Sequence, residues 1–351
     1  MPLTKMPPGV TMKSIAALAG VTQATVSLSL ANNPRIPAAT RERIQAIAKR
    51  LGYQPNPYVS ALMRTRRQGR PLPEKPVLAL VNAQRAADGW RNHPSATIRQ
   101  FREGAIERAA GRGYRAQEFW LHRDGMSAER FSAMLHARGI RGLLLSPLAE
   151  GDAPPALRWE HFAAVSLSTP HPALKIPSVC NDHYFSCLAA LRECRRRGYR
   201  RAGLVLHRIH RTRFQGRWQA GFLVGADLVP ELALAPPLYV ENWTMARPVA
   251  AWLRRERPEV IITSDGPALH TLLRREGWRV PAELGLIWLG CPRLGEALSG
   301  IWQNGPRIGA LAIDALVGLI ERHEHGLSEQ APTLMLEGVW NEGRTLRAAP
   351  G

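Results

Sequence analysis

The chain has 351 residues, of which 45% are hydrophobic and 21% charged, a globular composition on a length that favours two or three domains. Four cysteines are too few for a disulfide framework, no apolar stretch approaches the length of a membrane span, and the N-terminus lacks a secretory signal pattern. These features exclude fibrous, disulfide-scaffold and membrane classes, and they predict a cytoplasmic protein with reduced thiols.

The net charge of +19 is unevenly distributed. Residues 1–75 carry twelve Lys or Arg against two acidic residues, whereas the rest of the chain carries 35 against 26. A compact basic module joined to a less charged body suggests a polyanionic partner. A general richness in arginine would explain the same charge, so composition alone leaves both interpretations open.

The segment from Thr11 to Gly20 is predicted to form a helix. Thr11 is a good N-cap, and Ile15, Leu18 and Ala19 recur at helical spacing. Gly20 suits a left-handed exit from that helix.

A second, short helix is predicted from Gln23 to Leu30, with Thr22 as its N-cap and Val21 as a buried turn residue. Val26 and Leu30 are four residues apart and would pack inward. The residues that include the outward-facing positions are Gln23, Ala24, Thr25, Ser27 and Leu28.

A third amphipathic helix is predicted from Pro37 to Leu51, with Ile44, Ile47 and Ala48 on its inner face. Two helices around a glycine turn, with small polar side chains outward on the second, match helix-turn-helix geometry. Such a helix lies in the major groove, where glutamine bonds adenine and apolar groups contact the thymine methyl. A three-helix bundle without a ligand is the alternative, and the basic charge argues against it.

The N-terminal sixty residues closely resemble the lactose-repressor (LacI/GalR) family of transcriptional regulators. The segments that carry the resemblance are Val10 to Ser27, Pro34 to Ile36, Thr40 to Ile44 and Leu51 to Asn56. The resemblance implies a regulator, with repression as the expected sign, that binds a palindromic double-stranded DNA operator as a homodimer.

The resemblance also implies which residues meet DNA. Gln23, Ala24 and Leu28 occupy the main base-reading positions, while Thr22, Thr25 and Ser27 correspond to phosphate or supporting contacts. Further DNA contacts are expected from Arg35, Tyr53, Asn56 and Leu62. Leu28 stands where many members have arginine, and Ala31 stands where asparagine is usual, so the operator sequence should differ from that of the best-known members.

Residues 57–75 correspond to the family's hinge helix and linker, which folds only on DNA. Leu62 matches the leucine that enters the minor groove, where an apolar wedge kinks the duplex. The alternative is that Leu62 is a linker residue beneath the body. The prolines Pro71, Pro73 and Pro76 mark the domain boundary.

From Val77 onward, apolar runs alternate with amphipathic helical stretches, which predicts βαβ units and parallel sheets. The expected fold is an all-α helix-turn-helix domain (1–56) joined to an α/β two-lobed, periplasmic-binding-protein-like core (76–347). Lobe one is predicted at 76–196 plus 303–325. Lobe two is predicted at 197–302 plus 326–347.

An effector is expected in the cleft between the lobes, at the carboxyl ends of the strands. Both polar anchors of sugar-binding members are replaced, at Trp218 and Gly290, so standard monosaccharide binding is in doubt. Because tryptophan faces stack on sugars, a carbohydrate or sugar derivative remains a candidate effector. Core packing explains most of the tryptophans equally well. The candidate effector residues are Trp90, Ser146, Asp182, Trp218, Asp265 and Gln303.

The sequence gives little support for metal binding, cofactor binding or catalysis. Cys180, Cys187 and Cys194 recur every seven residues, a spacing that favours buried thiols over zinc ligands. No phosphate loop, nucleophile elbow or catalytic constellation is present, so no cofactor, metal or enzymatic activity is expected. A solute-binding protein would leave the basic head unexplained, and an enzyme with a DNA-targeting head would need a catalytic site. A transcription factor accounts for both halves.

Overall fold

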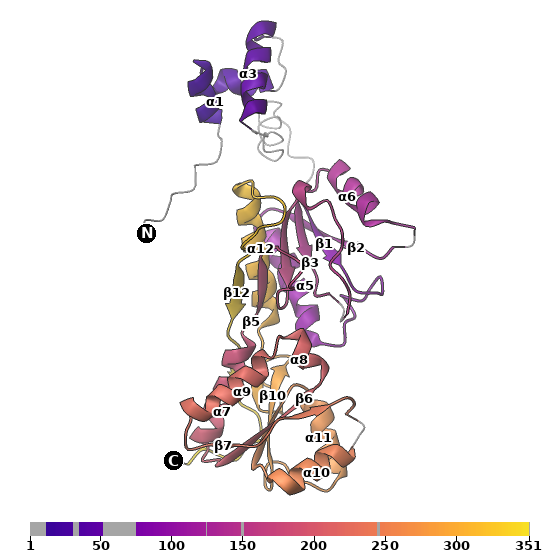
Figure 1. The fold of residues 1–351 in the computed structure, drawn as a ribbon, viewed down its shortest axis with the longest axis vertical. Coiled ribbons are helices and arrows are strands. Elements are labelled where there is room, and N and C mark those ends of the chain that lie inside the picture. Colours follow the sequence, from indigo (N-terminus) through magenta and orange to yellow (C-terminus); the bar gives the residue numbers. More distant parts are fainter. Residues whose placement is uncertain are drawn as a thin grey trace. The chain divides into compact units, whose positions relative to one another are not determined.

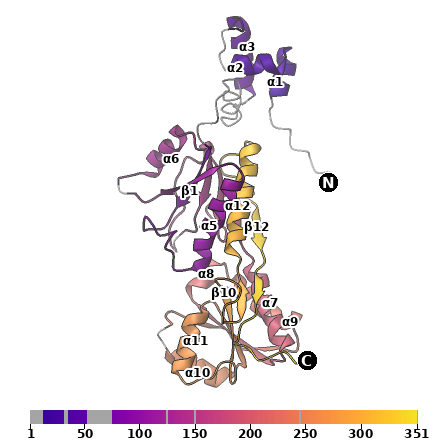
Figure 2. The same ribbon diagram turned by 180° about the vertical axis from the view of Figure 1, so that it is seen from behind.

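The computed structural model describes residues 12–30, 35–51, 75–123, 125–148, 151–243 and 246–350. In the N-terminal domain, α1 (Met12–Ala19), α2 (Gln23–Leu30) and α3 (Ala38–Arg50) pack against one another (Figures 1 and 2). These bounds agree with the three helices predicted from the sequence to within one residue at each described end.

The core of this domain forms where the inner faces of the three helices meet. Ile15, Val26 and Ile44 have no exposed surface, and each comes from a different helix. Leu18, which falls at helical spacing with Ile15, does not join this core, because its side chain is 59% exposed. Ala16, which the spacing did not single out, is buried in its place.

Lobe one of the core is a parallel sheet of six strands in the order β12-β5-β4-β3-β1-β2. Its last strand in the sequence, β12, pairs with β5, far from it in the sequence (Figure 1). Helix α12 lies beside α5 (Figure 2). The elements are β1 (Val77–Asn82), α5 (Ala96–Gly111), β2 (Arg115–Trp120), α6 (Ala128–Ala137), β3 (Gly142–Leu145), β4 (Ala163–Leu167), β5 (Ser178–Asn181), α12 (Gly305–Glu321) and β12 (Thr333–Leu336).

Lobe two contains a seven-stranded sheet in the order β13-β11-β10-β9-β6-β7, with β8 also paired to β6. All pairs are parallel except β11 with β13. The elements are α7 (His183–Arg196), β6 (Arg201–His207), α8 (Ile209–Arg213), α9 (Arg217–Leu228), β7 (Ala233–Leu234), β8 (Leu238–Val240), α10 (Ala246–Glu256), β9 (Val260–Thr263), α11 (Gly266–Arg275), β10 (Gly285–Cys291), β11 (Gly300–Trp302) and β13 (Val339–Asn341).

The predicted lobe boundaries need two corrections. Helix α7, assigned to lobe one, packs against α9, and its Cys187 and Leu191 belong to the core of lobe two. Strand β12, assigned to lobe two, extends the sheet of lobe one. The chain therefore changes lobe near residue 182 instead of 196, and near residue 337 instead of 325. Helical periodicity shows which face of a helix is buried but does not show which sheet covers it.

The three segments that cross between the lobes lie side by side and are hydrogen-bonded to one another. The Asn181 side-chain amide donates to the Gln303 carbonyl at 2.6 Å, and the Asp182 amide donates to the Leu336 carbonyl at 2.8 Å. At Gly338 an added Cβ would lie 2.2 Å from Ile301, so only glycine fits this crossing without displacement. The crossings are thus closely packed.

Two helices of lobe one pack at unusually short range. A Cβ at Gly309 of α12 would lie 2.0 Å from the Phe101 carbonyl oxygen of α5. Nearby, Asp314 forms ion pairs with Arg108 and Arg112 at 2.8 and 2.7 Å. Glycine therefore sets the helix separation, and these partly exposed ion pairs contribute little by comparison.

All four cysteines are buried and unpaired, as the sequence predicted. Burial raises the pKa of the Cys187 and Cys194 thiols, which keeps them protonated. Among the helices that the structure describes, none has the length and apolar character needed to cross a bilayer.

Candidate nucleic-acid interface and effector cleft

The start of helix α2 is fixed by its threonine cap. The Thr25 amide donates to Thr22 Oγ1 at 3.2 Å, and the two threonine hydroxyls are 3.0 Å apart. This cap satisfies one of the free amides at the helix start and sets the direction in which the first turn presents its side chains.

The outer face of α2 carries the six residues predicted to contact DNA. Thr22, Gln23 and Ala24 are exposed, and Thr25, Ser27 and Leu28 are partly exposed. Val26 and Ser29 form the buried side. Arg35 is also exposed, whereas the remaining predicted contacts, Tyr53, Asn56 and Leu62, lie outside the described residues.

Helix α3 supports the other two helices through bonds that the sequence pattern did not reveal. Arg43 donates from Nη2 to the Ala19 carbonyl at 3.1 Å, and Gln45 donates from Nε2 to the Ser29 carbonyl at 3.0 Å. Both acceptors lie at the last turn of their helices, where carbonyls lack helical partners. These bonds hold α1 and α2 at a fixed angle, which is what a groove-reading pair of helices needs.

Most of the predicted effector residues have structural partners. Asp182 caps α7 by accepting from the Phe185 amide at 3.0 Å, and Asp265 caps α11. Ser146 accepts from the Ala83 amide at 2.9 Å, which ties the ends of β1 and β3. Gln303 is 4% exposed and bonds the Leu289 carbonyl. Their roles toward an effector therefore stay predictions.

The structure does not support Trp90 as an effector-binding residue. Its side chain has no exposed surface, and its single donor, Nε1, bonds the Ile98 carbonyl at 3.0 Å. A residue buried in this way packs the loop after β1 against α5 and offers no face for a ligand to stack on. The abundance of tryptophan suggested a cleft role, but for this residue core packing is the correct explanation.

Trp218 belongs to a cluster of aromatic and histidine side chains that the sequence analysis missed. Its ring centroid lies 4.6 Å from His183, 4.8 Å from Phe214 and 5.3 Å from His210, and the His210 ring stacks on Phe214. These residues come from α7, from the start of α9 and from the segment between them around α8. No sequence motif joins them, because only the packing of α7 on α9 brings the first to the others.

Burial keeps the histidines of this cluster neutral. Burial, and then the nearby His210, Arg217 and Arg213, lowers the pKa of His183 to about 3. Burial, followed by Arg213, lowers the pKa of His210 to about 4. The cluster is thus an apolar-walled site surrounded by positive charge.

The cluster lies where lobe two meets lobe one. Gln215, in the turn before α9, donates from Nε2 to the Pro170 carbonyl of lobe one at 3.0 Å. Further along the same seam, Gln100 of α5 donates to the Pro292 carbonyl at 2.6 Å. These side-chain bonds join the lobes in this conformation.

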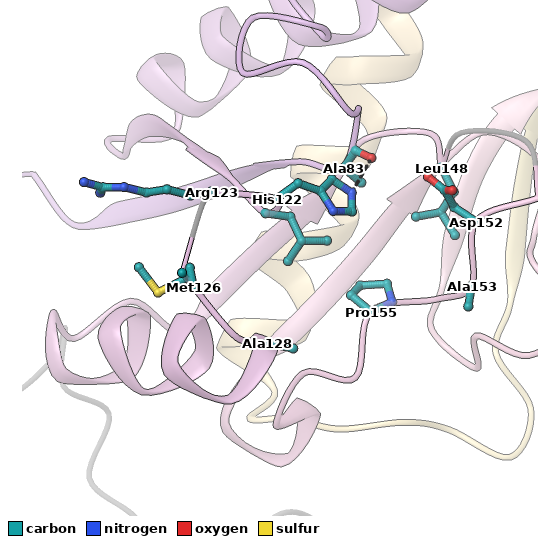
Figure 3. A pocket seen from close by; sticks show the side chains of 11 residues that line it. Ala83, His122, Arg123, Met126, Ala128, Leu148, Asp152, Ala153 and Pro155 are labelled. Carbon is teal, nitrogen blue, oxygen red and sulfur yellow. Dashed lines mark hydrogen bonds between the residues drawn. The ribbon is translucent and has the colours of Figure 1, made fainter.

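A pocket of about 420 Å³ opens at the carboxyl ends of β1, β2 and β3 in lobe one (Figure 3). His122 bonds the Ala83 carbonyl on one wall, and Asp152, paired with the exposed Arg85, lies on another. The Oδ2 atom of Asp152 is buried and has no hydrogen-bond partner among the residues that the structure describes. The remaining lining residues are Leu121, Arg123, Gly125, Met126, Ala128, Leu148, Ala153 and Pro155.

Comparison with known proteins agrees with this architecture. The sequence model of the family described as "Bacterial regulatory proteins, lacI family" matches residues 11–56, the segment that contains α1 to α3. The repressor CytR of Escherichia coli K12 is 25% identical over 302 residues, which is 82% of each chain. Residues 11–56 therefore form a DNA-binding domain of the lacI family type, and the chain is similar over most of its length to an HTH-type transcriptional repressor.

Two HTH-type transcriptional regulators are also similar to this chain. The regulator PtxS of Pseudomonas putida is 23% identical over 319 residues, covering 88% of this chain and 89% of PtxS. MalR of Staphylococcus xylosus is 49% identical over 47 residues, 13% of this chain. These relatives are transcriptional regulators, so the expectation of a regulator in place of an enzyme is confirmed.

Solved structures support the fold over nearly the whole chain. The regulator CelR in complex with cellobiose has a TM-score of 0.59 at 19% identity and covers 96% of this chain and 99% of its own. The lac repressor dimer bound to operator and the anti-inducer ONPF has a TM-score of 0.53 at 16% identity, covering 97% and 99%. The predicted combination of helix-turn-helix and two-lobed α/β core is therefore confirmed.

Proposed function

We propose that this regulator is a repressor that binds a palindromic DNA operator as a homodimer and that a small molecule in the core controls it. The observation that carries the DNA-binding part is the outer face of α2. Gln23 and Ala24 are exposed there while Val26 anchors the opposite side. A face of small and amide side chains allows close approach to base edges in the major groove.

Dimeric binding follows from the small number of bases that one such helix reaches. Two-fold operators mirror two-fold proteins, so an inverted repeat is expected. The dimeric lac repressor on its operator is a solved structure of the same fold and supports this assembly. Residues 57–75 are assigned to the hinge, with Leu62 entering the minor groove at the operator centre, and the protein is expected in the cytoplasm at the nucleoid.

The effector is assigned to the carboxyl edges of the two parallel sheets, where ligands of α/β proteins usually bind. The lobe-one pocket at Ala83 and His122 and the seam contact from Gln215 support this location. A carbohydrate or sugar derivative is the proposed class, in keeping with the CelR–cellobiose complex. A ligand that changes lobe closure must shift operator affinity, and DNA must shift ligand affinity by the same factor.

Selection of bound DNA from a random pool tests the DNA-binding proposal. The wild type should select an inverted repeat, and Leu28→Arg should shift preference toward guanine at one position in each half-site. A good bidentate contact discriminates by about 1–3 kcal/mol. Gln23→Ala should reduce the preference at a neighbouring base. Leu18→Arg adds the same charge to an exposed leucine on α1 and should leave the selected bases unchanged.

Two outcomes would contradict the proposal. If all four proteins select the same motif, α2 does not read the groove. If sedimentation gives a monomer at micromolar concentration together with tight one-to-one DNA binding, the dimeric arrangement is wrong.

A further inference from the structure

The cluster around Trp218 contains polar atoms that the protein leaves without partners. His183 Nδ1, His210 Nδ1, Trp218 Nε1 and Arg217 Nε are all buried and lack hydrogen bonds. His183 is 4% exposed and Trp218 is 5% exposed, so bulk solvent has little access to these side chains. A buried polar group left unbonded costs about 1–3 kcal/mol, and native proteins rarely contain several at one place.

The unpartnered atoms have a common chemical character. The indole and guanidinium nitrogens are donors only, and each neutral imidazole can place its proton on the free Nδ1 and become a donor as well. In the described part of the chain Arg217 forms no ion pair, and its guanidinium instead contacts the Met335 sulfur at 3.3 Å, a weak acceptor. The site is rich in donors and in positive charge.

The carboxylate closest in sequence to the cluster does not neutralise this charge. Asp182 precedes His183 directly, but its Oδ1 accepts the Phe185 amide as the cap of α7. Arg213, whose guanidinium lies 5.8 Å from the Phe214 ring centroid, adds further positive potential. The rings exclude water, and a low local dielectric strengthens any charge-assisted bond formed there.

We propose that His183, His210, Arg217 and Trp218 form the subsite that recognises an anionic group, a carboxylate or a phosphate, on the effector. The inference rests on the proposed control by a small molecule and specifies its class. The anion accepts hydrogen bonds from the donors that lack partners, and Phe214 and Trp218 provide apolar walls. A neutral sugar supplies no counter-charge for Arg217, so the site favours acidic or phosphorylated ligands.

Access to the subsite is coupled to the lobes. Gln215, which bonds Pro170 of lobe one, is two residues before Arg217, and Met335, which Arg217 contacts, lies in strand β12 of lobe one. The Nη1 atom of the same guanidinium contacts Met335, so an anion bound at Nε lies next to a contact between the lobes. Ligand binding therefore acts directly on the contacts that join the lobes.

Isothermal titration calorimetry on the full-length protein tests the inference with three matched probes. Glucose 6-phosphate and glucuronate carry the anionic groups, and glucose is the neutral control. At least one anionic probe should bind at least tenfold more tightly than glucose. The comparison between the phosphate and the carboxylate identifies which anion the site takes.

Variants locate the binding. Arg217→Gln removes the charge but keeps a donor, and it should weaken the anionic probe roughly tenfold or more. Trp218→Phe keeps the ring but loses the indole donor and should also weaken binding. Arg192→Gln removes the same charge from the exposed face of α7 and should have no effect. Circular dichroism spectra and thermal transitions confirm that each variant is folded.

Three results would overturn the inference: no heat from either anionic probe at millimolar concentration, binding of glucose as tight as that of both anions, or an equal effect of Arg217→Gln and Arg192→Gln. None of these results affects the selection of an operator. A neutral ligand that releases operator DNA would leave the proposed control intact while it refuted the anionic subsite.

Discussion

The burial of His183 predicts a specific loss of stability at low pH. The ring is 4% exposed and packs between Phe214 and Trp218, with centroid distances of 4.3 and 4.6 Å. Burial, and then the proximity of His210 and two arginines, lowers its pKa to about 3. In the unfolded chain the pKa returns to about 6.5. The unfolded state therefore binds a proton that the folded state excludes.

The sign and size of the effect follow from this difference. Because the unfolded state holds more protons below pH 6.5, the contribution is fully present above pH 6.5 and is lost progressively as pH falls toward 3. Each unit below 6.5 costs about 1.4 kcal/mol, so at pH 5 the free energy of unfolding should fall by about 2 kcal/mol from His183 alone. This figure is insensitive to the folded pKa as long as that pKa stays below 4.

Urea unfolding at pH 8 and pH 5 measures the effect. His183→Leu, which cannot titrate, should lose less stability between the two pH values than the wild type, by about 2 kcal/mol. His171→Gln, in a lobe-one loop, should retain the wild-type loss because His183 is intact. An equal loss in wild type and His183→Leu would show that this ring is not buried in its neutral form.

Two further predictions concern packing and the hinge. Gly309→Ala should destabilise the core by about 1–3 kcal/mol in chemical denaturation, because the new Cβ would lie 2.0 Å from the Phe101 carbonyl. Gly111→Ala, with no atom within 4 Å of the new Cβ, should instead be neutral or slightly stabilising, and destabilisation by both would contradict the argument. Leu62→Ala should weaken specific operator binding by a few kcal/mol and reduce DNA bending in a gel assay, while salt-sensitive non-specific binding remains almost intact. Wild-type bending and affinity in this variant would make Leu62 a linker residue.

The local signals of the sequence determined the secondary structure and much of the DNA-reading face. Helix α2 and strand β9 occupy the predicted residues. In both cases the signal is local: Thr22 caps the start of α2, and the apolar run Val260–Thr263 makes up the whole of β9. The same local spacing was misleading at Leu18, whose face of α1 is set by where α2 and α3 pack.

The core was accessible from the sequence only in outline. Alternating apolar runs and amphipathic helices predicted two parallel sheets, but they did not assign α7 and β12 to their lobes. A helix buries its apolar face equally well against either sheet, and the partner is chosen by contacts far away in the chain, such as those of Cys187 with lobe two. Strand β12 likewise gained its place by pairing with β5, about 150 residues before it.

The candidate effector site depended most on tertiary structure. The sequence named Trp218 but could not show that His183, thirty-five residues earlier, meets its ring, nor that Trp90 is completely buried. A polar group's availability to a ligand depends on whether the fold has already supplied it with a partner. Asp182 and Asp265 have such partners as helix caps, whereas Trp218 Nε1 and Arg217 Nε do not. Residue type and spacing determined which groups were present, and only the packing of lobe two decided which of them remain to be satisfied.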